Sequence, residues 1–105
     1  MKIYVSGPIT GTDDYVERFR VAELFLQGQG YEVVNPAKEN ACLPAGTSWE
    51  RYMGESLRLL CECDAIYMLR NSMQSRGAMV EYGVATAMDK EVMMEVVYNE
   101  ANYAG

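Results

Sequence analysis

The sequence predicts an α/β domain built on a parallel sheet of four strands. Four short segments rich in β-branched and aromatic residues end in turn formers, and the three longer segments between them repeat apolar residues at helical spacing. Such alternation is typical of a parallel sheet with helices on both faces. Right-handed crossovers and a first strand in the middle of the sheet then give a flavodoxin-like (Rossmann-like) three-layer sandwich with strand order 2-1-3-4.

The first half of the chain is expected to form two strands and one helix. Residues 2–6 (KIYVS) form the first strand, and residues 31–34 (YEVV) form the second. Between them, residues 13–27 repeat apolar side chains at helical spacing. Residues 37–46 (AKENACLPAG) are expected to be a loop. The apolar residues expected on the helix are Val16, Phe19, Val21, Leu24, Phe25 and Leu26.

The second half is expected to form two helices and two strands. Residues 47–61 form a helix that opens on the capping-box sequence TSWE. Residues 64–69 (DAIYML) form the third strand, residues 78–89 the third helix, and residues 91–98 (EVMMEVVY) the fourth strand. The tail, residues 99–105, has no apolar stripe and is expected to fray. The expected apolar faces are Met53, Leu57, Leu60 and Cys61 on the second helix, and Val80, Val84, Ala87 and Met88 on the third.

Length and composition exclude several classes of function. The 105 residues are enough for one small domain, and 15 acidic against 9 basic residues give a net charge of −6, which argues against nucleic acid and anionic membranes as partners. No apolar run approaches the roughly 20 residues of a membrane span. Three cysteines without a secretory signal indicate reduced thiols in a cytoplasm. Histidine is absent, so we expect no zinc site that needs imidazole, and no metal or redox cofactor.

Two loops are expected to meet at one edge of the sheet. Open parallel sheets bind ligands beyond the carboxyl ends of their strands where the strand order reverses, which here is between the first and third strands. Residues 6–11 (SGPITG) follow the first strand, and residues 71–78 (NSMQSRGA) follow the third. Both loops lead into helix N-termini, which favour anions, so we expect a phosphate-bearing or hydroxyl-rich ligand; the alternative is ordinary turn and capping residues. Candidate donors are Ser6, Thr10, Thr12, Ser72 and Ser75, with charge from Arg70 or Arg76.

Two residues near this edge have chemistry that fits a sugar ligand. Glu81 lies early in the third helix, where the helix dipole stabilises a carboxylate, and an ionised carboxylate facing a sugar is the nucleophile of retaining glycosyl transfer. Tyr4 lies two residues before the end of its strand, so its hydroxyl can reach Glu81 or a substrate. The alternatives are a capping glutamate and a core aromatic. Trp49 and Tyr52 can stack on a flat base, although packing is the commoner role, and Asp64 lies at the opposite end of the sheet.

Three segments in order resemble one known family. They are IYVSGPITG at residues 3–11, SWERYMGESLRLLCECDAIYML at 48–69 and SRGAMVEYGVATAMDK at 75–90. Together they resemble the nucleoside 2-deoxyribosyltransferase superfamily, and in particular a small branch with the SGPITG opening that is related to the 2′-deoxynucleoside 5′-phosphate N-hydrolase. The resemblance runs from residue 2 to about residue 97. It implies a flavodoxin-like fold and cleavage or exchange of an N-glycosidic bond.

The resemblance also implies roles for individual residues. Glu81 matches the nucleophilic glutamate, and Tyr4 matches the tyrosine that orients it. Ser75 matches the phosphate-binding serine of the phosphate hydrolase, where the free-nucleoside transferases carry an aspartate. The remaining residues that the resemblance implies for sugar and phosphate binding are Ser6, Gly7, Pro8, Ile9, Thr10 and Gly77.

Two functions stay open at this point. The first is an N-glycoside hydrolase or transferase that acts on a (deoxy)nucleoside or its 5′-monophosphate. The second is a non-catalytic nucleotide-binding module. One departure from the family supports this alternative to the enzyme: the family's helix-2 aspartate falls near Ser56, with Glu55 as a weak substitute. A flavin-binding flavodoxin also fits the fold class. The open edges of a four-stranded sheet favour a homodimer or larger homo-oligomer.

Overall fold

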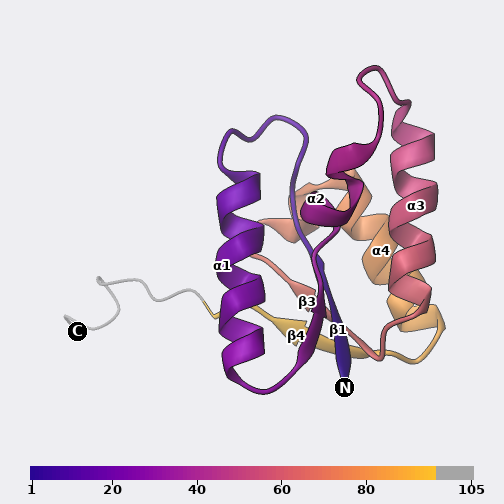
Figure 1. Cartoon of the computed structure of the whole chain (residues 1–105). Coiled ribbons are helices and arrows are strands. Elements are labelled where there is room, and N and C mark those ends of the chain that lie inside the picture. The colour runs from indigo at the N-terminus through magenta and orange to yellow at the C-terminus, as the bar shows by residue number, and fades with distance from the viewer. Residues whose placement is uncertain (97–105) are drawn as a thin grey trace, which may run out of the picture.

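The sheet has the topology that the sequence predicts. The computed structural model describes residues 1–96 (Figure 1). Strands β1 (Lys2–Ser6), β2 (Glu32–Val34), β3 (Ala65–Met68) and β4 (Glu91–Met94) pair in parallel in the order β2-β1-β3-β4, which confirms the flavodoxin-like α/β prediction. The helices are α1 (Tyr15–Gly28), α2 (Pro36–Glu39), η1 (Asn40–Cys42), α3 (Trp49–Cys61), η2 (Ser72–Gln74) and α4 (Arg76–Ala87).

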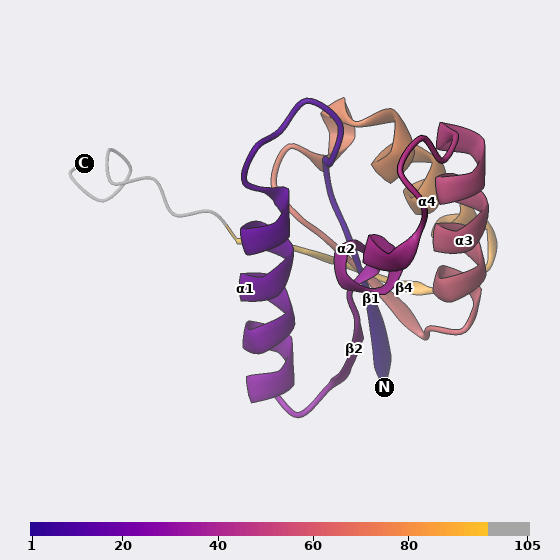
Figure 2. The same cartoon turned by 45° about the horizontal axis from the view of Figure 1, so that its top comes forward.

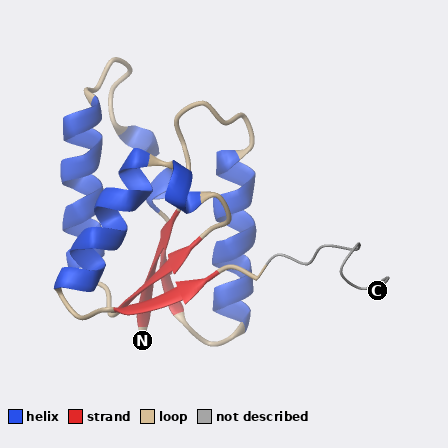
Figure 3. Ribbon diagram, turned by 180° about the vertical axis from the view of Figure 1, so that it is seen from behind, coloured by secondary structure: helices blue, strands red, loops and turns tan. Residues whose placement is uncertain are grey.

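Helices cover both faces of the sheet. α1 packs on one face, and α3 and α4 lie side by side on the other (Figures 1 and 3). The loops that follow β1 and β3 both emerge at the edge where the strands end, as the turned view also shows (Figure 2). Within residues 1–96, no helix combines the length and the apolar character needed to cross a bilayer.

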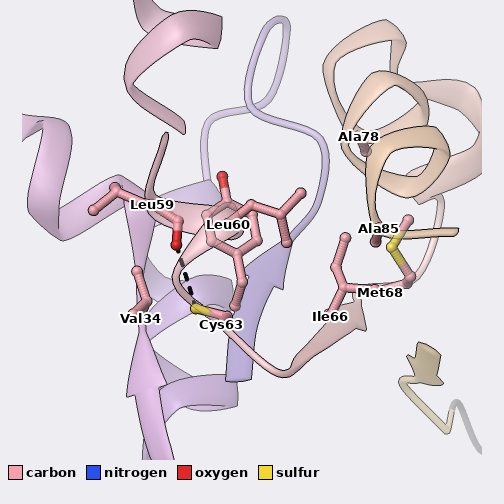
Figure 4. Packing of buried hydrophobic residues seen from close by; sticks show 9 residues of the cluster. Val34, Leu59, Leu60, Cys63, Ile66, Met68, Ala78 and Ala85 are labelled. Atoms are coloured by element: carbon pink, nitrogen blue, oxygen red, sulfur yellow. Dashed lines mark hydrogen bonds between the residues drawn. The ribbon is translucent and has the colours of Figure 1, made fainter. Parts of the chain in front are cut away.

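β1 divides the core into two clusters because its side chains alternate between faces. Ile3 and Val5 pack under α1 with Phe19, while Tyr4 faces α3 and α4. In the second cluster the Cys63 thiol donates to the Leu59 carbonyl at 3.4 Å (Figure 4). Figure 4 also shows members of this cluster from several elements, namely Val34, Leu60, Ile66, Met68, Ala78 and Ala85.

The expected apolar face of α1 is wrong in part. Phe19 and Leu26 are buried, but the others of the expected set are between 53% and 58% exposed, and Ala22 is buried instead. At about 100° per residue, positions 19, 22 and 26 form one stripe toward the sheet, whereas positions 21 and 24 point the opposite way. Phe25 lies at the border, where its ring stacks on Tyr67 of β3 with the ring centroids 6.5 Å apart. The helix carries apolar residues on both sides, so its pattern does not reveal which side is buried.

α4 also buries a different stripe from the expected one. The buried residues are Ala78, Glu81 and Ala85, while Val84 is half-buried and the other expected residues are exposed. The small alanines allow the helix to lie close to the sheet. On α3, Ser56 and Leu59 are buried with Leu60, whereas the expected Cys61 is exposed and Met53 and Leu57 are half-buried.

Several boundaries differ from the expectation. The expected loop at 37–46 contains α2 and η1, because Asn35 accepts hydrogen bonds from the Ala37 and Lys38 amides, and Pro36 fills the first helical position. Ser48 caps α3, and α4 begins at Arg76, two residues earlier than expected. β4 ends at Met94, and residues 97–105, which include the tail, lie outside the described residues.

Replacing Gly7 with alanine is expected to lower the free energy of unfolding by about 1–3 kcal/mol. A Cβ at this position would lie 2.8 Å from Cδ1 and 3.0 Å from Cβ of Leu69, so the turn after β1 would have to move. Urea unfolding measures the change.

The matched control is Gly83→Ala in α4. A Cβ there meets nothing within 4 Å, and the better helix propensity of alanine should raise stability by about 1 kcal/mol. Equal stability of Gly7→Ala and wild type would contradict the close approach of this turn to Leu69.

Candidate active site

The carboxyl ends of β1 and β3 hold the two candidate loops side by side. Ser6 is paired with Met68 in the sheet, and the Leu69 amide donates to the Ser6 carbonyl at 2.8 Å. The Ser72 hydroxyl donates to the Leu69 carbonyl and lies 3.4 Å from the Ser6 carbonyl. These hydrogen bonds therefore connect the start of the loop after β3 to the end of β1.

Glu81 lies behind these loops and accepts two side-chain hydrogen bonds from β1. The Tyr4 hydroxyl donates to Oε2 of Glu81, and the Ser6 hydroxyl donates to Oε1 at 2.6 Å. Tyr4 and Ser6 are two residues apart on a strand, so both point to the face that α4 covers. Glu81 is only 6% exposed, and both hydroxyl-bearing residues are fully buried. The carboxyl group is thereby fixed in one orientation.

Burial controls the ionisation of this cluster. It raises the pKa of Glu81 from 4.5 to about 7, while the hydrogen bonds from Ser6 and Tyr4 act in the opposite direction. Burial, followed by the negative charge of Glu81, holds the pKa of Tyr4 well above its ordinary value. Tyr4 therefore stays a hydrogen-bond donor, while the Glu81 carboxyl changes its charge near neutral pH.

An open cleft of about 660 Å³ lies between the two loops and the start of α3. Four of the expected binding residues line it, namely Pro8, Thr10, Ser75 and Gly77. Gly77 is one helical turn before Glu81 on α4, but Glu81, Tyr4 and Ser6 themselves are not among the lining residues. The full lining is Pro8, Thr10, Thr12, Arg18, Trp49, Asn71, Gln74, Ser75, Arg76 and Gly77.

The other expected binding residues have different surroundings. Gly7 is buried against Leu69, and Ile9 is 40% exposed without lining the cleft. The Ser6 hydroxyl is bound to Glu81 instead of being open to a ligand. Ser75 is the N-cap of α4, and its hydroxyl accepts a hydrogen bond from the Ala78 amide at 3.3 Å.

The residues singled out on the second expected helix separate in the structure. Trp49 lines the cleft, whereas Tyr52 does not. Ser56 is buried and accepts a hydrogen bond from the Asn40 side chain at 3.1 Å. Glu55 pairs with Arg58 at 3.3 Å on the surface of α3. Neither of the two candidate positions on α3 therefore brings a carboxylate to Glu81.

Sequence reasoning missed Arg18, which lines the cleft from the first turns of α1. Of the two arginines expected to add charge, Arg76 lines the cleft and Arg70 does not; the backbone carbonyl of Arg70 accepts a hydrogen bond from Arg18 at 2.8 Å. The sequence contains a signal for Arg18: a cation near a helix N-terminus is unfavourable, and the start of α1 faces the cleft, so an arginine there suggests a role in binding an anion. Asp64 lies at the opposite end of the strands, directly before β3, where its carboxylate accepts a hydrogen bond from the Lys2 amide at 2.8 Å.

The site offers no obvious metal cage. Among residues 1–96, no three histidine, cysteine, aspartate or glutamate side chains are grouped so that they could hold a metal ion. The chemistry available in this region is therefore a buried carboxyl with two hydroxyl partners, next to a cleft lined by hydroxyls, an indole and two guanidinium groups.

The fold is shared with solved 2-deoxyribosyltransferases. The enzyme from the psychrotolerant bacterium Bacillus psychrosaccharolyticus superimposes with a TM-score of 0.72 at 19% identity, over 93% of this chain and 77% of the other. The 2-deoxyribosyltransferase from Leishmania mexicana gives a TM-score of 0.66 at 19% identity, over 89% of this chain and 62% of the other. This chain thus spans less than two thirds of the Leishmania protein. No curated protein sequence matches this chain significantly.

The family within this fold class follows from the sequence match. Residues 1–97 match the family described as "Domain of unknown function (DUF4406)". The match covers most of the chain, so the chain belongs to this family.

The raised pKa of Glu81 predicts a pH dependence of stability. An unfolded chain releases the Glu81 proton near pH 4.5 and the folded chain releases it near pH 7, so the free energy of unfolding should fall by about 3 kcal/mol as pH rises through this window. The contribution is fully present below pH 4.5 and is lost above pH 7. Urea unfolding between pH 4 and pH 8 measures it.

The variant Glu81→Gln should lose this component and be more stable than wild type above pH 7, because it buries no charge. The exposed Glu50→Gln variant, at the start of α3, should keep the wild-type profile. Parallel profiles for Glu81→Gln and wild type would rule out Glu81 as its source.

Proposed function

We propose that this chain cleaves or exchanges the N-glycosidic bond of a (deoxy)nucleoside or its 5′-monophosphate, with Glu81 as the nucleophile. One observation carries the proposal: Tyr4 and Ser6 hold the buried Glu81 carboxyl in a fixed orientation one helical turn from the lining of a cleft. A volume of about 660 Å³ lies within the usual range for small-molecule sites. The fold shared with two 2-deoxyribosyltransferases supports glycosyl chemistry.

In the proposed reaction, ionised Glu81 attacks the anomeric carbon of the sugar. The bond from this carbon to the base nitrogen breaks through an oxocarbenium-like transition state, its electron pair leaves with the base, and a covalent glycosyl–Glu81 ester forms. Water, or a second base, then displaces Glu81. Tyr4 and Ser6 orient the carboxylate, and a pKa of about 7 leaves a substantial ionised fraction at neutral pH.

The loops beside the cleft are proposed to bind the rest of the substrate. Ser75 and Gly77 begin α4, where free amide groups favour an anion, so they suit the phosphate of a nucleotide. Pro8 and Thr10 line the same cleft from the turn after β1. This placement supports the relationship to 2′-deoxynucleoside 5′-phosphate N-hydrolases.

A non-catalytic nucleotide-binding module is the second candidate. Two observations favour it. The resemblance places the family's helix-2 aspartate near Ser56, which accepts a hydrogen bond from Asn40, and Glu81 is 6% exposed and does not line the cleft. Such a module would keep the cleft and lack the chemistry.

Release of free base separates the two candidates. We expect purified protein to release base from at least one member of a panel of 2′-deoxynucleosides and their 5′-monophosphates, and Glu81→Gln to abolish it because an amide cannot form the ester. Tyr4→Phe should slow release roughly 10- to 100-fold, since a hydrogen bond to a charged group contributes about 1.5–3 kcal/mol. Chromatographic detection of free base is the measurement.

Tyr82→Phe is the matched control for Tyr4→Phe, because Tyr82 is half-buried next to Glu81 in sequence and its change removes the same hydroxyl group. It should leave the rate unchanged. Binding of nucleotides without base release from any of them would establish the module and overturn the enzyme.

We also propose that the chain forms a homodimer or larger homo-oligomer. Among residues 1–96, β4 lies at one edge of the sheet and pairs only with β3, and α1 exposes Val21 and Leu24, each more than half accessible. Sedimentation at micromolar concentration should show a mass above that of the 11.8 kDa monomer. Leu24→Glu should shift the population toward monomer, whereas Met79→Glu on α4 should not; a clean monomer in wild type would refute the assembly.

A further inference from the structure

The cleft has the opposite charge from the chain as a whole. The chain carries a net charge of −6. The ten residues that line the cleft include two arginines, Arg18 and Arg76, and no aspartate or glutamate. A concave surface lined by one sign of charge concentrates ligands of the other sign. The lining therefore favours an anionic ligand on an otherwise acidic protein.

Neither arginine is neutralised by a carboxylate within residues 1–96. The ion pairs in this part of the chain involve Arg20, Lys38 and Arg58. Arg18 donates through Nη2 to the carbonyl of Arg70, which uses one of its five N–H groups and leaves its charge uncompensated. In a chain with 15 acidic and 9 basic residues, two arginines without acidic partners in one cleft are unexpected.

The position of Arg76 is electrostatically unfavourable in the absence of a ligand. Arg76 is the first residue of α4, whose first turn holds no acidic residue. Arg18 is the fourth residue of α1, whose first turn also holds Glu17. Cations at a helix N-terminus oppose the helix dipole. A bound anion between them would reverse this, because it would interact favourably with both guanidinium groups and with the start of α4.

Trp49 holds Arg76 without removing its charge. The Arg76 guanidinium lies over the Trp49 ring, 5.1 Å from the ring centroid, so the two residues form a cation–π pair between the starts of α3 and α4. A cation–π contact uses the face of the ring and none of the N–H groups of the guanidinium, so these groups can still donate to an oxygen anion. Trp49 is thus a positioning residue for Arg76.

We propose that Arg76, together with Arg18, selects a phosphorylated ligand, so that the substrate of the site is a nucleoside monophosphate and not a free nucleoside. The planar fork of a guanidinium matches the oxygens of a phosphate, and two such groups match its double negative charge. The nucleoside part of the ligand rests on the proposed function. The phosphate part rests on the charge and geometry of the cleft.

Fluorescence titration tests the selection directly, because Trp49 is the only tryptophan in the chain and lies in the cleft. The ligands are a panel of 2′-deoxynucleoside 5′-monophosphates, the matching free nucleosides and inorganic phosphate. We expect the best monophosphate to bind at least 10-fold more tightly than its free nucleoside and than inorganic phosphate. Arg76→Gln should weaken monophosphate binding roughly 10- to 100-fold and leave nucleoside binding unchanged.

Arg58→Gln is the matched control. It removes the same charge from the exposed face of α3, where Arg58 pairs with Glu55 and Glu62, and should not change any affinity. For Trp49, binding is measured by calorimetry: Trp49→Phe should keep the preference for monophosphates, because a ring remains under Arg76, and Trp49→Ala should reduce it. Thermal unfolding establishes that each variant is folded.

The outcomes distinguish this inference from the proposed function. Equal affinity for monophosphate and free nucleoside, an unchanged preference in Arg76→Gln, or inorganic phosphate binding as tightly as the nucleotide would each overturn the inference. Base release at equal rates from nucleosides and monophosphates would overturn it while the proposed function stands. Selective monophosphate binding that Arg76→Gln abolishes, without any base release, would support the inference and overturn the proposed enzyme.

Discussion

The burial of one carboxyl group between two hydroxyls of β1 is the constraint on which the site depends. A carboxyl group that leaves water needs hydrogen-bond partners, and Glu81 finds them in Tyr4 and Ser6. This requires β1 to lie next to β3, α4 to cross the face to which Tyr4 points, and alanines at 78 and 85 to let the helix approach. The parallel topology, the handedness of the crossover and the small residues of α4 therefore serve the same contact.

The buried carboxyl group of Glu81 and the positive charges of the cleft lie at different depths in the molecule. The acid lies inside, where desolvation raises its pKa, while the positive charges line the open cleft. In the proposed function, a phosphate brought near Glu81 would disfavour its ionisation further, because like charges repel. Arg18 and Arg76 would offset that effect by compensating the phosphate before its field reaches the carboxyl. In the proposed function, this separation would allow an anionic substrate to be bound next to an anionic nucleophile.

The strands were predictable from sequence because their β-branched runs and terminal turns are local features, and chirality then fixes their order. The helix faces were not. α1 has apolar residues on both sides, and the buried stripe of α4 contains Glu81 and two alanines, so hydrophobicity does not mark it. The proximity of Tyr4 and Glu81 was inferable, since both lie near the same sheet edge. The hydrogen bond from Ser6 to Glu81 and the position of Arg18 in the cleft depend on tertiary packing, which local sequence patterns do not indicate.

The sequence separation within the buried cluster has a consequence for synthesis. Glu81 is 75 residues from Ser6 and 77 from Tyr4, and β1, the second strand of the sheet, has a neighbour on either side. On the ribosome, β1 emerges long before α4 exists, and it must wait for β3 before the sheet closes around it. A nascent polypeptide that ends before residue 81 would lack the carboxyl group that accepts the hydrogen bonds of the Tyr4 and Ser6 hydroxyls. Assembly of the cluster is therefore a late event in the synthesis of this domain.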